Sequence, residues 1–240
     1  MKTPYAFASV ITNLAFLMLP CGAIAETPRG PLPDGVVLER SSPPLFHKVK
    51  LFVVGSLPLG EFGSSDPSSS GSGFAYPGVG GGAEFSKEII QHFGFAISGM
   101  FIVHGYNVSG WKDLIPYWHW DGDSRVVYAL TGGVLYDLDF SPSVNVYGTA
   151  QVGILHVSYP NLLLTDQMGE EATLLASSQL AAGYKLSLGT TVKKFDVSVQ
   201  FLYGEPEFQP SYQYRLERTV FLPEKLPVRA LMVSIGLLLN

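Results

Sequence analysis

The chain has 240 residues, of which 15% are charged and 26 are glycine, and its mean hydropathy is positive at +0.24. Soluble domains carry about a quarter charged residues, and a helical membrane protein needs about 18 consecutive apolar residues, which no segment after the N-terminal region has. Low charge, many glycines and aromatics, and no such helix favour a transmembrane β-barrel. The excess of 20 acidic over 15 basic residues gives no indication of nucleic-acid binding.

Residues 1–25 are predicted to be a cleaved secretory signal. Lys2 supplies a positive start, residues 6–19 are mostly apolar, and the Ala-Ile-Ala at 23–25 puts small residues at the positions that a signal peptidase inspects. A membrane anchor is the alternative. Cys21, the single cysteine, would leave with the signal, so the mature chain is expected to have no disulfide.

Residues 26–47 are rich in proline and lack periodicity, and we interpret them as a periplasmic leader. From residue 48 onwards, eight stretches alternate between an apolar and a more polar face, which is the period of a β-strand. The clearest is 141–158, where small or apolar side chains alternate with Asn145, Tyr147, Thr149 and Gln151. The eight predicted strands are residues 48–58, 78–87, 93–104, 125–138, 141–158, 177–188, 195–203 and 227–239.

The connections between these strands alternate in length. The four long ones, predicted as loops, are residues 59–76, 108–123, 159–175 and 205–226. Outer-membrane barrels have short periplasmic turns and long extracellular loops, and an even number of strands puts both chain ends in the periplasm. A soluble lipocalin-like barrel is the alternative, but it would hold its apolar residues inside, whereas here the smaller, more polar face fits the lumen.

The architecture and the last strand resemble a known family. Residues 234–240, Ser-Ile-Gly-Leu-Leu-Leu-Asn, are similar to the C-terminal signal that the barrel-assembly machinery reads, although the family usually ends on an aromatic residue rather than on Asn240. Residues 48–240 resemble the small eight-stranded outer-membrane barrels of Gram-negative bacteria, of the OmpA, OmpX and OmpW type. This resemblance implies an all-β, eight-stranded antiparallel up-and-down transmembrane barrel in the cell outer membrane. The expected partners are outer-membrane lipid, lipopolysaccharide and the barrel-assembly machinery, with no cofactor.

Five charged side chains are predicted to point into the lumen, mostly in its periplasmic half. They are Lys50, Glu84, Asp137, Lys185 and Asp196. The interior of an eight-stranded barrel is just wide enough for side chains to fill, and an isolated buried charge is costly. We therefore expect opposite charges to pair as a structural plug. A conduit for ions or protons is the alternative.

His156, Ser158 and Glu170 resemble the catalytic group of lipid A deacylase barrels. In that resemblance the serine attacks an ester, the histidine is its base and the acid orients the histidine. Tyr159 follows the serine where that family has an oxyanion-stabilising Asn. The alternative interpretation is two polar side chains at the level of the lipid headgroups. No metal-ligand cluster or phosphate-binding motif is evident in the sequence.

The sequence thus predicts a non-enzymatic outer-membrane barrel with a structural or surface-recognition role through its four long extracellular loops. The segment 116–120, Pro-Tyr-Trp-His-Trp, is either an adhesive loop tip for an extracellular ligand or part of an interfacial aromatic belt. Lipid A ester hydrolysis and a conduit for small hydrophobic solutes are the two alternative functions.

Overall fold

The computed structural model describes the chain from His47 onwards, with short gaps. The described residues are 47–66, 72–107, 119–122, 124–165, 167–175, 177–209, 211–214, 217–220 and 224–239. The predicted signal, Cys21, nearly all of the predicted leader and Asn240 lie outside them. Within the described part of the chain, no helix has the length and hydropathy needed to cross a bilayer.

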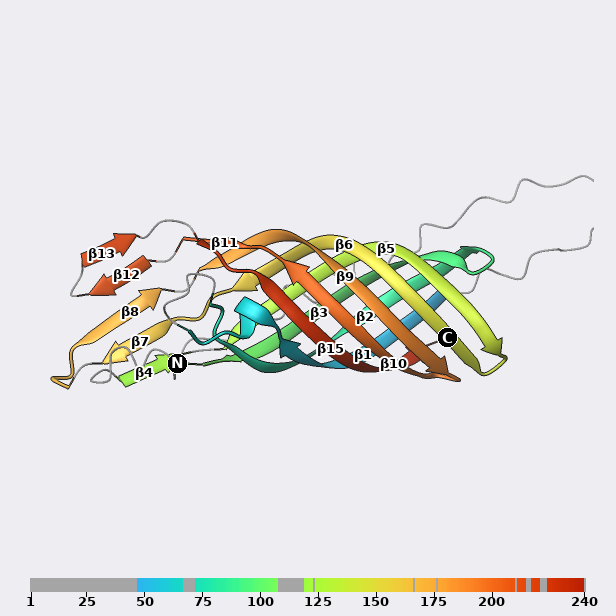
Figure 1. Cartoon of the computed structure of the whole chain (residues 1–240), viewed down its shortest axis with the longest axis horizontal. Helices are drawn as coiled ribbons and strands as arrows, with labels where there is room; N and C mark the ends of the chain where they lie inside the picture. The colour runs from blue at the N-terminus through green and yellow to red at the C-terminus, as the bar shows by residue number, and fades with distance from the viewer. Residues whose placement is uncertain are drawn as a thin grey trace, which may run out of the picture. The chain divides into compact units, whose positions relative to one another are not determined.

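Eight antiparallel strands close into a barrel (Figure 1). Each strand pairs with the preceding and following wall strand, and the last wall strand pairs with the first. This arrangement confirms the predicted eight-stranded up-and-down barrel. The strands are β1 (His47–Pro58), β2 (Ala75–Ile90), β3 (Phe93–Tyr106), β5 (Arg125–Ser141), β6 (Val144–Ser158), β9 (Ser178–Val192), β10 (Phe195–Gly204) and β15 (Val228–Leu239).

The alternation of the side chains matches the predicted faces. On β6, Tyr147, Thr149 and Gln151 are buried in the interior, whereas Val152 and Ile154 are exposed on the outer wall. Period-two alternation puts the two sets on opposite faces of the sheet, because successive side chains of a strand point in opposite directions.

Several strands are longer than predicted, among them β3, which reaches Tyr106, and β9, which reaches Val192. β2 begins at Ala75 rather than at Gly78, because its pairing with β3 resumes beyond an irregularity in the register between these two residues. β5 continues to Ser141, where a two-residue turn leads directly into β6. The hydrogen-bonded ladder therefore extends past the point where the apolar periodicity fades.

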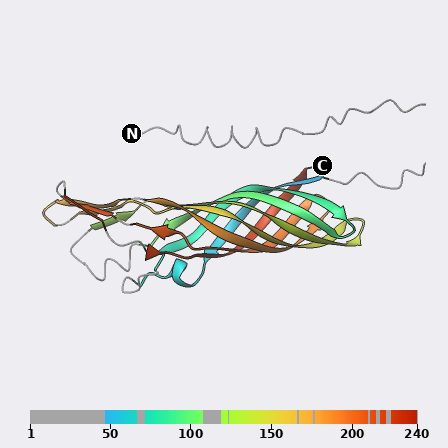
Figure 2. The same cartoon turned by 90° about the horizontal axis from the view of Figure 1, so that it is seen from above.

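The two ends of the barrel differ in their connections. Two-residue turns join β2 to β3, β5 to β6 and β9 to β10 at one end, where β1 starts and β15 finishes. Long connections leave from the other end, and Figure 2 shows the strands running obliquely between the two. The predicted alternation of long and short connections is confirmed.

The prediction that the long connections are loops was wrong in part. Three of them supply a second, five-stranded antiparallel sheet in the order β13-β12-β8-β7-β4 beyond the end of the barrel (Figure 1). Its strands are β4 (His119–Gly122), β7 (Leu162–Thr165), β8 (Glu171–Leu175), β12 (Ser211–Tyr214) and β13 (Glu217–Val220). A two-stranded pair, β11 (Glu207–Phe208) with β14 (Glu224–Lys225), and a 3-10 helix, η1 (Gly60–Gly63), complete the connections. Strands this short lack a periodic signal, and their pairing joins distant parts of the chain.

Candidate functional site: the barrel interior and its outer wall

The outer wall of the barrel is apolar. Large aliphatic and aromatic side chains from all eight wall strands are exposed on it, among them Val53, Val79, Ile97, Leu130, Val152, Leu188, Val199 and Ile235. A soluble protein rarely exposes a contiguous apolar surface of this extent. In a bilayer the same surface contacts lipid chains, while a closed barrel satisfies its backbone groups internally.

Lys50 is the centre of a charged cluster inside the barrel. Its Nζ lies 3.0 Å from Glu84 Oε1 and 3.2 Å from Asp196 Oδ1. The same ammonium donates a hydrogen bond of 2.8 Å to the Tyr147 hydroxyl. These side chains come from β1, β2, β10 and β6, so the cluster spans the lumen.

Lys185 on β9 joins the cluster through the same carboxylate. Its Nζ lies 3.2 Å from Glu84 Oε2, and Gln151 Nε2 donates to that oxygen over 3.3 Å. Thr131 in turn donates to Gln151 Oε1 over 2.6 Å. Because Glu84 and Asp196 balance the two lysines, the cluster has no net charge, and its charges are stabilised by pairing rather than by water.

Tyr147 links Lys50 to Asp196. Its hydroxyl donates to Asp196 Oδ1 over 3.0 Å, and Thr191 donates to the other carboxylate oxygen over 3.2 Å. A Cβ atom at Gly189 would lie 2.5 Å from the tyrosine ring. Gly189 on β9 therefore makes room for this ring, which is a close-packing reason for a glycine inside a strand.

The structure brings four of the five predicted lumen charges together. Asp137, the fifth, pairs instead with Lys48, whose Nζ lies 2.8 Å from Asp137 Oδ2. The Lys48 side chain is 38% exposed, so this pair lies at the margin of the lumen. Alternation along the strands indicated that these residues point inward, but it gave no indication of Tyr147 and Gln151 as their bridging partners.

The half of the lumen nearer the long connections is filled by apolar side chains, a layer that the prediction of a charged plug did not include. The buried core there includes Phe52, Val54, Ile102, Leu155, Leu202 and Met232. A signal was available, because Phe52-Val53-Val54 is apolar on both faces of β1 where a water-filled lumen would need polar inward positions. Between the two layers, Gln200 Nε2 donates to Ser198 and Ser234, whose hydroxyls also share a hydrogen bond.

The three residues of the predicted hydrolase group are engaged separately. Ser158 Oγ accepts a hydrogen bond of 3.0 Å from Val126 N and donates one of 3.2 Å to Val126 O. The His156 ring lies against Tyr128, and Glu170 accepts a hydrogen bond from Tyr214. In the structure the serine is bound to the backbone of β5 rather than to a histidine base.

The aromatic segment 116–120 lies mostly outside the described residues. Of the segment 116–120, only the backbone of the last two residues is described, as part of β4. No group of three or more His, Cys, Asp or Glu side chains suited to a metal ion occurs among the described residues.

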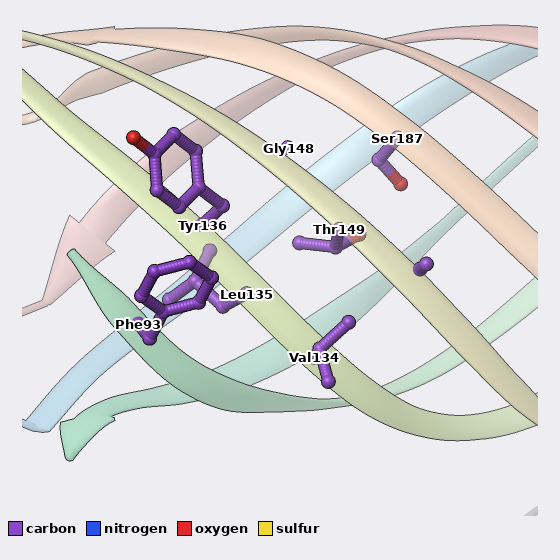
Figure 3. A pocket seen from close by; sticks show the side chains of 8 residues that line it. Phe93, Val134, Leu135, Tyr136, Gly148, Thr149 and Ser187 are labelled. Atoms are coloured by element: carbon purple, nitrogen blue, oxygen red, sulfur yellow. The ribbon is translucent and has the colours of Figure 1, made fainter. Parts of the chain in front are cut away.

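A hollow of about 390 Å³ lies in the barrel wall (Figure 3). The rings of Phe93 and Tyr136 lie next to each other at one side of it, with centroids 4.9 Å apart and planes inclined at 57°. Its other lining residues are Val134, Leu135, Gly148, Thr149, Ala150 and Ser187. The mostly apolar lining suits lipid chains better than a polar substrate.

A closed eight-stranded barrel with an apolar outer wall and an interior filled by paired polar and apolar side chains defines the class of this protein. It is a small transmembrane barrel of the outer-membrane type. No protein-family model matches the chain, and no curated protein matches it.

Several solved structures are similar to the chain. The structure of Ail, the attachment invasion locus protein of Yersinia pestis, in complex with the heparin analogue sucrose octasulfate is 15% identical, with a TM-score of 0.44, and the match covers 80% of this chain and 97% of that one. Neisserial surface protein A is 12% identical, with a TM-score of 0.43 and coverage of 80% and 96%. A major outer membrane protein from Thermus thermophilus is 12% identical, with a TM-score of 0.49 and coverage of 81% and 100%.

Proposed function

We propose that this protein is a non-enzymatic outer-membrane barrel that carries a surface-recognition sheet. The single observation that carries the proposal is the five-stranded sheet built from three long connections. A barrel that served only as a membrane plug would not need these connections to be folded. The proposed orientation has the short turns and chain ends in the periplasm and the sheet outside the cell.

An apolar core joins the sheet to the barrel. Leu162, Leu164 and Ala172 of the sheet pack with Phe74 and with Tyr106 of β3. Packing of this kind lowers the conformational entropy that binding costs, because the recognition surface is already ordered. The sheet therefore combines an extended surface with firm packing against the barrel.

The opposite face of the sheet offers polar groups for recognition. Thr173, Gln213 and Arg218 stand side by side on β8, β12 and β13, because Gln213 pairs with both of the others in the register. The buried Leu164 and Ala172 belong to the other face. Leu163, which pairs with Thr173 and is exposed, adds one apolar side chain to this face. A mainly polar face backed by an apolar one suits contact with a polar extracellular ligand.

The paired lumen argues against a solute conduit. Lys50, Lys185, Glu84 and Asp196 are all buried and bonded to one another, and apolar side chains fill the bore beyond them. The backbone bonds of Ser158 argue against lipid A ester hydrolysis, since a nucleophile needs its hydroxyl bonded to a base.

The test is ligand binding by the full mature protein in lipid nanodiscs on an array of glycans and extracellular-matrix proteins. Gln213→Lys changes the polar face and is expected to reduce binding at least about tenfold, since an interface residue of this kind can contribute more than 1 kcal/mol. Met168→Lys, in the exposed turn between β7 and β8, is the control and should bind as the wild type does. Absence of binding together with release of acyl chains from lipid A, measured by mass spectrometry, would refute the proposal.

A further inference from the structure

We propose that the outer mouth of the lumen binds a small inorganic oxyanion that carries a proton, namely phosphate, through Arg125 and His104. The two residues are direct partners in the ladder between β5 and β3, and both point inward. They lie at the end of the barrel that bears the long connections, away from the Lys50 cluster.

Arg125 is a buried cation with two unpaired nitrogens. Its side chain is 1% exposed, and its Nε and Nη2 have no hydrogen-bond acceptor among the described residues. Its guanidinium carbon lies 4.7 Å from the centroid of the Tyr159 ring and 5.4 Å from that of Phe62 on η1. Aromatic faces offset only part of the loss of water around a guanidinium, so an anion is the missing partner.

His104 supplies an unfilled acceptor beside this cation. Its Nδ1 lies 2.9 Å from the carbonyl oxygen of Tyr76, and a carbonyl can only accept, so Nδ1 carries the proton. Nε2 of the neutral ring is then an acceptor, and it is buried without a partner in the described part of the chain. A Cβ at Gly78 would lie 2.7 Å from Nδ1, so this glycine leaves the ring the room it occupies.

One aromatic ring holds the two groups together. The His104 ring packs edge-on against Phe62 with centroids 5.0 Å apart, and Arg125 lies over the same Phe62. The two unfilled donors and the one unfilled acceptor therefore belong to paired neighbouring residues that both contact one side chain of η1. Buried polar groups left unpaired in this way call for a ligand or an ordered molecule between them.

The chemistry of these groups restricts the ligand to a small anion that also carries an O–H group. The guanidinium needs acceptor oxygens with negative charge, and His104 Nε2 needs an O–H donor. Phosphate near neutral pH has both in one small ion. Sulfate, chloride and ionised carboxylates have only acceptors, and water has no charge. The barrel wall separates this site from the lipid, so a free ion rather than a lipid headgroup fits it.

The experiment is calorimetric titration of inorganic phosphate into the mature wild-type protein in detergent micelles at pH 7 and constant ionic strength. We expect saturable binding at one site. Sulfate should bind at least about tenfold more weakly, because it leaves the histidine acceptor unpaired. Arg125→Met should lose phosphate binding at least about tenfold.

Arg229→Met is the matched control. Arg229 also lies over a tyrosine ring, with its guanidinium carbon 5.5 Å from the Tyr203 centroid, but it follows the buried Val228 on β15 and so points to the outer face. Its loss should leave phosphate affinity unchanged. His104→Leu gives a second test that does not depend on the folding of Arg125→Met, because it should lower phosphate affinity to the level of sulfate.

Three outcomes would overturn the proposal. They are no saturable phosphate binding by the wild type, equal binding by Arg125→Met, and a preference for phosphate over sulfate that survives His104→Leu. The first would leave water between the unpaired groups, and the other two would put any bound phosphate elsewhere on the protein.

Discussion

At the scale of single residues, the lumen lysines differ in how many polar partners would lose an interaction if the lysine were removed. Lys50 bonds Glu84, Asp196 and Tyr147, Lys185 bonds Glu84, and Lys48 bonds Asp137 at the lumen margin. The alternation in the sequence was enough to place the first two inside. It could not identify their partners, because Lys185 and Glu84 are 101 residues apart and meet only through closure of the barrel.

We predict that replacing these lysines by alanine destabilises the barrel in the order Lys50, Lys185, Lys48. Lys50→Ala strips a counter-ion from two buried carboxylates and should cost about 3–5 kcal/mol. Lys185→Ala leaves Glu84 paired with Lys50 and should cost less. Lys48→Ala leaves the buried Asp137 without its cation, but the Lys48 side chain is 38% exposed, so water can reach the site and this variant should cost the least. Urea unfolding in micelles measures all three, and a larger effect for Lys48→Ala than for Lys50→Ala would contradict the assignment.

A second prediction concerns the two faces of β6. Val152 is 70% exposed on the outer wall near the middle of the strand, whereas Thr149 is 6% exposed inside. Val152→Arg should cost about 2–4 kcal/mol by placing a charge in lipid, and Val192→Arg, beside the short turn after β9, should cost about 0–1 kcal/mol. Thr149→Arg should disturb interior packing without this dependence on depth. Folding into bilayers followed by heat modifiability measures the difference, and equal penalties for Val152→Arg and Val192→Arg would argue against a lipid-facing wall.

At the scale of elements, the wall strands and the short strands beyond them differed in how well the sequence predicted them. β6 and β10 carry ten residues or more of alternating pattern, and lipid and lumen reinforce that pattern on opposite faces. β7 and β12 have four residues each and are held by pairing between separate connections. That pairing is tertiary, so local sequence carried no sign of it. The same holds for Phe62, which η1 inserts above Arg125 from a segment rich in serine and glycine.

A third prediction tests the packing inside β9. Gly189→Ala would push a Cβ against the Tyr147 ring at 2.5 Å and should cost about 1–3 kcal/mol through overpacking. Gly99→Ala on β3 is the matched control, since its Cβ would meet nothing within 4 Å. Urea midpoints should separate the two variants. Equal midpoints would mean that Tyr147 can move aside without loss of the cluster.

At the scale of the whole molecule, the protein consists of a barrel with a filled interior and a five-stranded sheet formed by its long connections. The polar cluster blocks one half of the bore and apolar side chains fill the other. Both layers consist of buried side chains among the described residues, in keeping with the narrow interior of eight-stranded barrels, which side chains fill. The sequence predicted the charged layer but not the apolar one, because only the charged inward positions were interpreted as a plug.

The fourth prediction is that the wild-type protein is electrically silent in a planar bilayer, apart from small and rare openings. Lys185→Ala should raise the frequency of small openings, since it removes one of the two cations that hold Glu84 across the bore. Single-channel recording measures both. Stable openings of porin size in purified wild-type protein would contradict a filled lumen.

The contact between Lys50 and Tyr147 has a mechanical consequence. β1 and β6 are four strands apart whichever way the wall is followed, so the Lys50 and Tyr147 side chains, joined by a 2.8 Å hydrogen bond, together span the tube from one side to the other. A hydrogen-bonded wall resists stretching around its circumference, yet it can flatten into an ellipse with little change in strand pairing. A strut across the diameter opposes that flattening. The barrel can therefore keep a round cross-section under the lateral pressure of a crowded membrane. The strand ends that carry the five-stranded sheet then keep their spacing as the bilayer around the barrel fluctuates.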